Sequence, residues 1–317
     1  MSADNNHKPA MDLVFREIAA YVSTPMVFTE LAYDTARLAL IDALGCAMLA
    51  LDFPACTRLL GPVVPGAVMS MGARVPGTSY ELDPVQAAFN LGSMVRWLDF
   101  NDTWLAAEWG HPSDNIGAIL PVADYISRQN EAQGLAPLCM HDVLTAMIKA
   151  YEIQGCFALE NGFNDHGLDH VVLVKLASCA VVTAMLGGDE EAVMRAVSNV
   201  FVDGQSLRTY RHAPNTGSRK SWAAGDACAR AVRLALLTMA GEMGYPSALT
   251  APKWGFYDVS WAGSCFKFQR PYASYVMENV LFKLSYPAEF HAQTAVECAV
   301  ILHAACQGRV EIGRAHV

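Results

Sequence analysis

The sequence predicts a mainly α-helical protein. Three observations favour this fold class: long segments repeat apolar residues every three or four positions, strand-like runs are few, and the chain shows neither an alternating βαβ pattern nor an internal repeat. Of the 317 residues, 53% are apolar and 17% are charged. That balance is typical of a globular protein with a sizeable core, built as one large domain or two ordinary ones.

The first expected helix covers 30–50, where strong helix formers alternate with apolar residues at helical spacing. A second helix is expected over 85–97. Asp83 and Pro84 precede it as an N-cap and a first-turn proline, the two residue types that favour a helix start.

The remaining expected elements follow in chain order. Gly187 and Gly188 should end one helix, and Gly244 with Pro246 should end another, because glycine and proline terminate helices. Two short segments lean toward strand and could pair as hairpin pieces. The expected helices cover 141–159, 171–186, 190–200, 221–243 and 292–305, and the strand-like segments are 77–82 and 264–268.

Composition excludes several classes of function. The net charge of -9 argues against binding nucleic acid through a general basic face. No apolar run approaches the roughly 18 residues of a membrane span, and the N-terminus lacks a basic-then-apolar signal pattern. We therefore expect a cytoplasmic protein that binds neither nucleic acid nor membrane.

The nine cysteines do not form a disulfide or metal framework. Their number is odd, no C-x-x-C pair occurs, and most lie in apolar helical surroundings. Free cysteine in such surroundings behaves as a small core residue. We expect no metal site.

The segment 98–115, LDFNDTWLAAEWGHPSDN, is the most informative part of the chain. It places acids, a histidine and a threonine beside Phe100, Trp104 and Trp109. Ionisable groups held against aromatic surface shift their pKa values, as active sites require. The alternative is a surface loop whose tryptophans support the fold while its acids cap flanking helices.

A basic segment, 208–220, carries five cationic or imidazole side chains and no acid. Because it precedes an expected helix start, helix dipole and cations together could bind carboxylate or phosphate. The alternative is a solvated loop that balances acids elsewhere. Two further segments are ambiguous: His170 could cap a helix or face a cavity, and the turn at 283–291 could join a shared site or be merely polar.

Together these segments offer acids, imidazoles and an anion pocket without metal ligands or a Ser-His-Asp arrangement. That inventory fits proton-transfer chemistry on a small polycarboxylate, which needs a positioned base and cationic partners for the developing charge.

The motifs LDFNDTW, EWGHPSDN, GLDHVVLVK, SLRTYRHAPNTGSRKSWAAGDA and KLSYPAEFHAQTAVE resemble those of the MmgE/PrpD family. The resemblance runs from about Ala32 to Glu297. It implies a large all-helical N-terminal domain, with only the start of a smaller α+β C-terminal domain in this chain. We expect the first to cover 1–280 and the second to begin at 281–310, whereas 311–317 reads as a non-native tail.

The resemblance also implies an activity. It points to a hydro-lyase that converts 2-methylcitrate to 2-methyl-cis-aconitate in propionate breakdown, without metal or cofactor, and that could also hydrate cis-aconitate. The expected partner is a small tricarboxylate, and a homodimer is compatible with the family. Two alternatives stay open: a cis-aconitate decarboxylase, and a truncated fragment without activity.

By motif, the family's catalytic positions fall on Asp99, Thr103, His111, His170 and Lys220. We expect Asp102, Glu108 and Asp114 to serve structure. Candidate substrate-binding residues come from the basic segment and the 283–291 turn; they are Arg208, Arg211, His212, Arg219, Lys283, Glu289 and His291.

Overall fold

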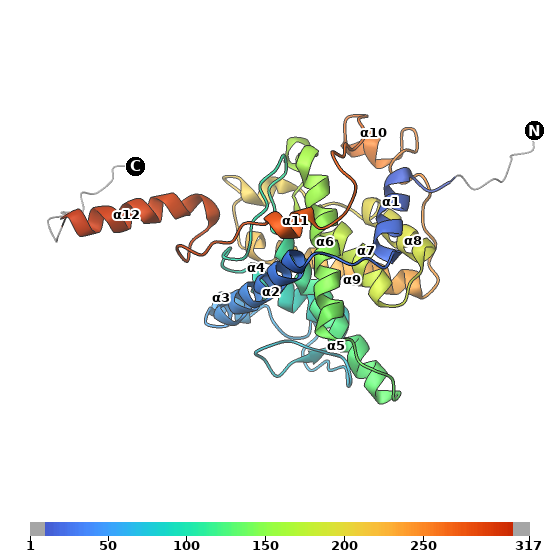
Figure 1. Cartoon of the computed structure of the whole chain (residues 1–317), viewed down its shortest axis with the longest axis horizontal. Coiled ribbons are helices and arrows are strands. Elements are labelled where there is room, and N and C mark those ends of the chain that lie inside the picture. Colours follow the sequence, from blue (N-terminus) through green and yellow to red (C-terminus); the bar gives the residue numbers. More distant parts are fainter. Residues whose placement is uncertain (1–9, 307–317) are drawn as a thin grey trace, which may run out of the picture.

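A computed structural model of the chain describes residues 10–306 and confirms the mainly α fold (Figure 1). The longer helices are α1 (Leu13–Ser23), α2 (Glu30–Ala50), α4 (Pro84–Arg96), α5 (Ile116–Ala132), α6 (Met140–Glu160), α7 (Val171–Met185), α8 (Glu190–Val202), α9 (Arg219–Met239) and α12 (Gln293–Cys306). Short α-helices are α3 (Pro54–Thr57), α10 (Phe256–Ser260) and α11 (Tyr275–Asn279), and 3-10 turns are η1 (Pro112–Asn115), η2 (Phe163–His166), η3 (Arg208–Arg211) and η4 (Phe290–Ala292).

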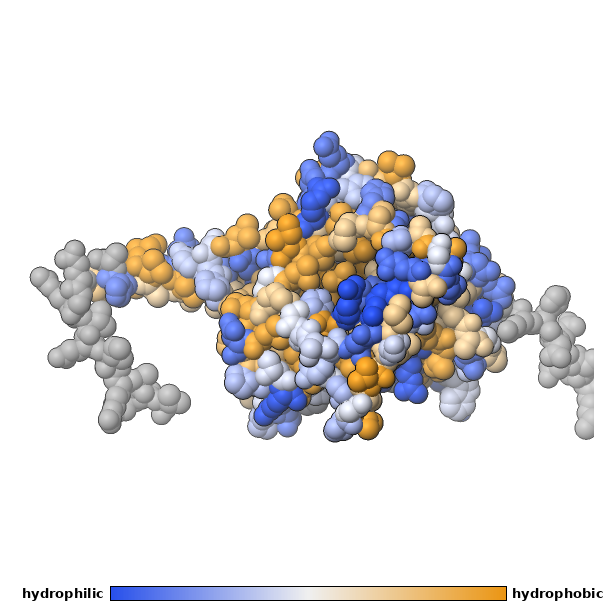
Figure 2. Space-filling view, turned by 90° about the horizontal axis from the view of Figure 1, so that it is seen from below, coloured by the Kyte–Doolittle hydropathy of each residue, from blue (hydrophilic) through white to orange (hydrophobic). Residues whose placement is uncertain are grey.

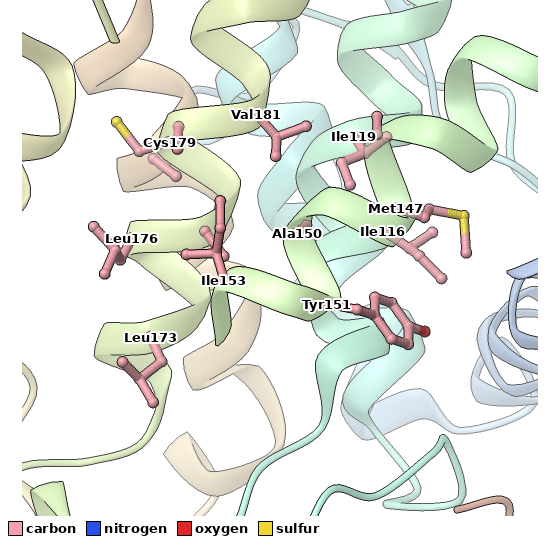
Figure 3. Packing of buried hydrophobic residues seen from close by; sticks show 14 of the residues in the cluster. Ile116, Ile119, Met147, Ala150, Tyr151, Ile153, Leu173, Leu176, Cys179 and Val181 are labelled. Atoms are coloured by element: carbon pink, nitrogen blue, oxygen red, sulfur yellow. The ribbon is translucent and has the colours of Figure 1, made fainter. Parts of the chain in front are cut away.

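The core lies where α5, α6 and α7 meet. Figure 3 shows apolar side chains of these helices, among them Ile119, Ile153 and Leu176, gathered in it. Thirteen of the fifteen residues of α7, from Val171 to Thr183, are buried, so this helix is surrounded on all sides. A helix buried all round needs no polar face, which explains why 171–186 reads as almost uninterrupted apolar sequence.

Three glycines allow α4, α5 and α9 to cross at close range. A Cβ added to Gly117 would lie 2.5 Å from the Cα of Gly92, and one added to Gly92 would lie 2.8 Å from the Cα of Gly225. No larger side chain fits at such a crossing without moving backbone. The crossing matters because it draws together the C-terminal end of α4 and the N-terminal ends of α5 and α9.

Most expected helix boundaries agree with the structure within two residues. Asp83 caps α4 as predicted, accepting hydrogen bonds from the N–H groups of Val85 and Gln86. The exception is α9, which ends at Met239 rather than near 243. Gly241, with φ of 104°, ends this helix before Gly244 is reached.

The strand predictions are only partly correct. Glu81–Leu82 (β2) pairs antiparallel with Ala73–Arg74 (β1), which was not anticipated. Within the described residues, 264–268 forms no strand, and that prediction is wrong. Its Phe266 packs at 5.0–5.7 Å from several aromatic rings, including Phe163 and Trp261, so its β-favouring residues serve core contacts instead of a sheet.

Helices α1 and α5 were not predicted either. Pro121 lies inside α5, and polar residues lead into its first turn, so the sequence pattern there suggests a loop. The expected helix at 292–305 is confirmed as α12, which extends from the body with apolar residues over much of its surface (Figure 2). The proposed tail at 311–317 lies outside the described residues, and the domain boundary at 280 stays a prediction.

No helix in the described part of the chain is long and apolar enough to cross a membrane. All nine cysteines fall within 10–306 and are free, and five of them are buried, as expected of core residues.

Candidate active site

The five catalytic candidates and Lys283 come from four separate parts of the chain. Asp99, Thr103 and His111 lie on the loop that joins α4 to η1, His170 is the N-cap of α7, and Lys220 is in the first turn of α9. Two isolated bridges shape the loop. Trp104 pairs with Gly110, which folds the loop on itself, and Thr103 pairs with Leu281, which brings the segment after α11 against it.

Asp99 is surrounded by three cations and a histidine. We call this group the Asp99 cluster (Asp99, Arg96, Lys220, Lys283 and His111). Its Oδ1 lies 2.5 Å from Arg96 Nη1 and 3.1 Å from Lys283 Nζ. Its Oδ2 lies 3.4 Å from Lys220 Nζ. Burial opposes ionisation of Asp99, but the charges of Arg96 and Lys283 outweigh it and hold the pKa of this carboxyl well below its usual range.

Asp99 also has left-handed backbone geometry, with φ of 59°. An aspartate tolerates this region better than most residues but still at a cost, and such strained positions concentrate at functional sites. The surrounding contacts maintain it: Lys283 Nζ donates to the main-chain oxygen of Asp99 at 2.7 Å, in addition to its contact with the carboxylate.

The tautomer of His111 follows from its hydrogen bond. Its Nδ1 lies 2.6 Å from the carbonyl oxygen of Asp102, and a carbonyl can only accept, so Nδ1 carries the hydrogen. Burial, followed by the charge of Arg96, lowers the pKa of His111 well below its usual value. The ring is therefore neutral near pH 7, with an unprotonated Nε2 that lies 3.7 Å from Asp99 Oδ1.

His170 lies beside His111, with ring centroids 5.8 Å apart and the rings edge to face. Its Nδ1 is 3.5 Å from Asp169 Oδ1, and its Nε2 is buried without a hydrogen-bond partner in the protein. Burial lowers the pKa of His170 to about 3, although Asp169 acts in the opposite direction. Two neutral imidazole rings thus lie next to each other at this site.

The remaining residues of the site are Thr103, Lys220 and Lys283. The Oγ1 of Thr103 is buried without a protein partner. The side chain of Lys283 is fully buried, whereas that of Lys220 is 45% exposed. Burial lowers the pKa of Lys283, against the opposing effect of Asp99. Lys220 is therefore the cation that an incoming anion can reach, and Lys283 is the one already desolvated.

The structure divides the basic segment. Arg211 forms a buried ion pair with Asp169, and Arg208 lies 3.6 Å from Glu108 and 4.0 Å from Asp169. Charge balance by acids from elsewhere, the alternative raised above, describes both arginines.

Two of the three remaining members of that segment make no contact with these acids. Arg219 pairs with Asp226 at 2.9 Å and lies over the ring of Trp222, and His212 is exposed. Only Lys220 from this segment joins the Asp99 cluster.

Glu289 and His291 contact each other, and His291 also contacts Trp109 on the loop that carries Asp99 and His111. His291 Nδ1 lies 2.7 Å from Glu289 Oε1, and its ring stacks on Trp109 at 4.7 Å. A cavity of about 350 Å³ lies nearby, lined by Ala107, Glu108, Trp109, Asn164 and Arg208.

Two residues that contact the catalytic candidates were not singled out from the sequence. Arg96, at 3% exposure, is the closest cation to Asp99, and Asp169 contacts both His170 and Arg211. A signal for Arg96 was present, since an arginine three residues before an aspartate ends a helix that is otherwise uncharged.

Two of the acids expected to serve structure accept hydrogen bonds from neighbouring side chains or backbone. Asp102 accepts from the N–H and Oγ of Ser113, and Asp114 accepts from Asn101. Among residues 10–306, no group of three or more His, Cys, Asp or Glu side chains is arranged to hold a metal ion.

Comparison with known proteins decides the family. The MmgE/PrpD N-terminal domain matches residues 16–269, which is most of the chain. The chain belongs to the MmgE/PrpD family.

Relatives within this family are very similar to the chain. It is 67% identical over 304 residues to the 2-methylcitrate dehydratase of Escherichia coli K12 and 66% identical over 307 residues to that of Cupriavidus necator. It is also 60% identical over 301 residues to the mitochondrial 2-methylcitrate dehydratase of Yarrowia lipolytica. These alignments cover 94–96% of the chain but only 58–63% of the relatives. The chain thus spans about three fifths of the length of the curated relatives that it matches.

Proposed function

We propose that this chain carries the acid–base machinery of a 2-methylcitrate dehydratase, a hydro-lyase that removes water from 2-methylcitrate. The observation that carries the proposal is that two neutral imidazoles, His111 and His170, pack together next to Asp99 and the lysines that contact it. The names of the relatives support the choice of substrate.

The first step is removal of a proton from the carbon next to a substrate carboxylate. His111 presents an unprotonated Nε2, and the Nε2 of His170 is buried without a protein partner, so one of the two imidazoles can accept this proton. As the C–H bond breaks, negative charge moves onto the adjacent carboxylate. Lys220, with the nearby Arg96 guanidinium, is placed to stabilise that charge in a partly desolvated site.

The second step is loss of the hydroxyl group from the neighbouring carbon. The electron pair of the broken C–H bond forms the double bond, the C–O bond breaks, and the oxygen takes a proton and leaves as water. The Lys283 ammonium suits this role, because a lysine whose pKa is lowered by burial gives up its proton more readily. Asp99 holds this ammonium, and Thr103 Oγ1 is free to bond a substrate oxygen.

The test is a dehydration assay of this chain, and of a chimera extended to full length with the corresponding part of the E. coli relative. We expect formation of the unsaturated tricarboxylate without release of carbon dioxide. His111→Gln should reduce turnover by about 10²-fold or more, since it removes a positioned acid–base group. His141→Gln is the matched control, because His141 is exposed and stacks on Tyr33 rather than on His170.

Wild-type turnover in His111→Gln would refute the assignment, and carbon dioxide release would show a decarboxylase instead. The cytoplasmic location and a homodimer remain proposals that rest on the sequence and the family.

A further inference from the structure

Asp169 is a buried carboxylate that the proposed reaction does not use directly. It is fully buried, and Arg211 holds it with two N–H groups: Nε bonds Oδ2, and Nη2 bonds Oδ1 at 3.1 Å. The N–H of Val171 also donates to Oδ1 at 3.2 Å. Paired hydrogen bonds from a planar guanidinium fix the position of a carboxylate more firmly than a single contact does.

The backbone on either side of Asp169 is fixed as well. Its own N–H donates to the carbonyl of Ser206 at 2.9 Å, and the N–H of Arg208 donates to the carbonyl of Gly167 at 2.9 Å. The segment that carries Arg211 is thus hydrogen-bonded directly to the turn that precedes α7.

The ring of His170 lies against this carboxylate. Its Nδ1 faces Asp169 Oδ1 at 3.5 Å, and a carboxylate can only accept hydrogen bonds. A hydrogen on Nδ1 makes this contact favourable, whereas an unprotonated Nδ1 would place two lone pairs side by side. The remaining nitrogen, Nε2, is buried, has no protein partner and lies on the ring that packs edge to face on His111.

We propose that Asp169, clamped by Arg211, is a positioning residue that holds His170 in the Nδ1–H tautomer, so that its Nε2 is free to accept a proton. The inference rests on the proposed function for its catalytic meaning, but the orientation itself can be measured without turnover. The same carboxylate stabilises the imidazolium that forms when Nε2 takes a proton, as a charged partner does and a main-chain carbonyl does not.

The charge of the group beside Nδ1 differs between the two histidines. His111 is held by the carbonyl of Asp102, and the first charge that acts on it is the positive one of Arg96. His170 has the carboxylate of Asp169 as its first charged neighbour; the positive groups around it, Arg211, Arg96 and Arg208, act more weakly. His170 therefore has a charged acceptor beside its Nδ1, whereas His111 has a neutral one.

The experiment is nitrogen NMR of the purified chain labelled at histidine nitrogens, with His170 assigned by loss of its signals in His170→Gln. We expect the Nδ1–H tautomer of His170 near neutral pH. In Asp169→Asn the amide NH₂ can donate to Nδ1, so the ring should change largely to the Nε2–H tautomer. Asp12→Asn is the matched control, since Asp12 is another buried carboxylate that accepts from Leu249 N–H and Thr250 Oγ1.

A second variant keeps the test valid if Asp169→Asn does not fold. Arg211→Gln keeps both Asp169 and His170 in the chain but removes the guanidinium that clamps the carboxylate, so the Nδ1–H tautomer of His170 should become mixed with the Nε2–H tautomer. Circular dichroism would verify that each variant is helical.

Two results would overturn the proposal: an Nε2–H tautomer of His170 in the wild type, or a folded Asp169→Asn variant whose His170 tautomer is unchanged. In the full-length chimera, Asp169→Asn should lower kcat by about 10-fold or more with little change in KM, because it affects proton transfer rather than anion binding. If the chimera does not dehydrate 2-methylcitrate, the proposed function fails while the tautomer measurement still stands.

Discussion

Replacing Asp99 with asparagine tests the electrostatic centre of the site. The substitution keeps the size of the side chain but removes the negative charge that faces Arg96 at 2.5 Å and Lys283 at 3.1 Å. Both cations are nearly or fully buried, with side-chain exposures of 3% and 0%. Removing one partner of a buried ion pair leaves the other charge without compensation.

The expected loss of stability follows from this geometry. Breaking a buried pair typically costs about 3–5 kcal/mol, whereas an exposed pair is worth about 0–1 kcal/mol. Lys220, 45% exposed, belongs to the second class and adds little. Because Lys283 can lose its proton and so avoid part of the cost, we expect about 3 kcal/mol, or about a 10²-fold change in the unfolding equilibrium.

The effect should depend on pH in one direction. The pKa of Asp99 is lowered in the folded protein, so its contribution is present above the unfolded value of about 3.9 and is lost as pH falls below it. The stability difference between wild type and Asp99→Asn should therefore stay nearly constant from about pH 8 to about pH 5 and shrink below about pH 4.

Urea unfolding followed by far-UV circular dichroism measures this difference. Asp34→Asn is the matched control: Asp34 pairs with Arg37 on the surface of α2, with both side chains more than half exposed, and should change stability by less than about 1 kcal/mol. An Asp99→Asn variant as stable as the control at about pH 7, or a difference that persists undiminished at about pH 3, would refute the reasoning.

Two further predictions concern packing and thiol chemistry. In Gly155→Ala the new Cβ would lie 2.4 Å from a methyl carbon of Val276, so urea unfolding should show a loss of about 1–3 kcal/mol, whereas Gly45→Ala, with nothing within 4 Å, should be neutral or stabilising. A stable Gly155→Ala variant would contradict this packing of α11 on α6. A thiol reagent should modify the exposed Cys139 quickly but leave Cys179 unmodified until the chain unfolds, because burial raises the pKa of Cys179 to about 12. Mass spectrometry measures the rate of modification at each position. Equal rates at the two positions would be inconsistent with the described core.

The fold class could be predicted because helical periodicity is a local property of the chain. The boundaries of α2 and α4 follow from propensity and from the cap at Asp83, which involve only neighbouring residues. The failure at 264–268 has the opposite cause: whether Phe266 enters a sheet or an aromatic core depends on residues far away in the sequence.

The candidate site shows the same division. The density of acids beside tryptophans singled out the loop that carries Asp99 and His111. The basic segment, by contrast, could not be divided from sequence alone. Which acid neutralises Arg211 and which lysine remains to meet Asp99 depends on how α7 and α9 pack, and charge composition carries no information on that.

The bridge between Thr103 and Leu281 has a consequence for folding during synthesis. Lys283 and Asp99 are 184 positions apart in the chain, and the helices from α5 to α11 lie between them in sequence. A nascent chain can form α2 through α9 from local contacts long before this loop closure becomes possible, because contacts of large sequence separation form late. Asp99, with its strained backbone, therefore acquires the Lys283 ammonium only when the segment after α11 has left the ribosome. Until then the charge centre formed by Arg96, Asp99 and Lys220 lacks its fully buried ammonium.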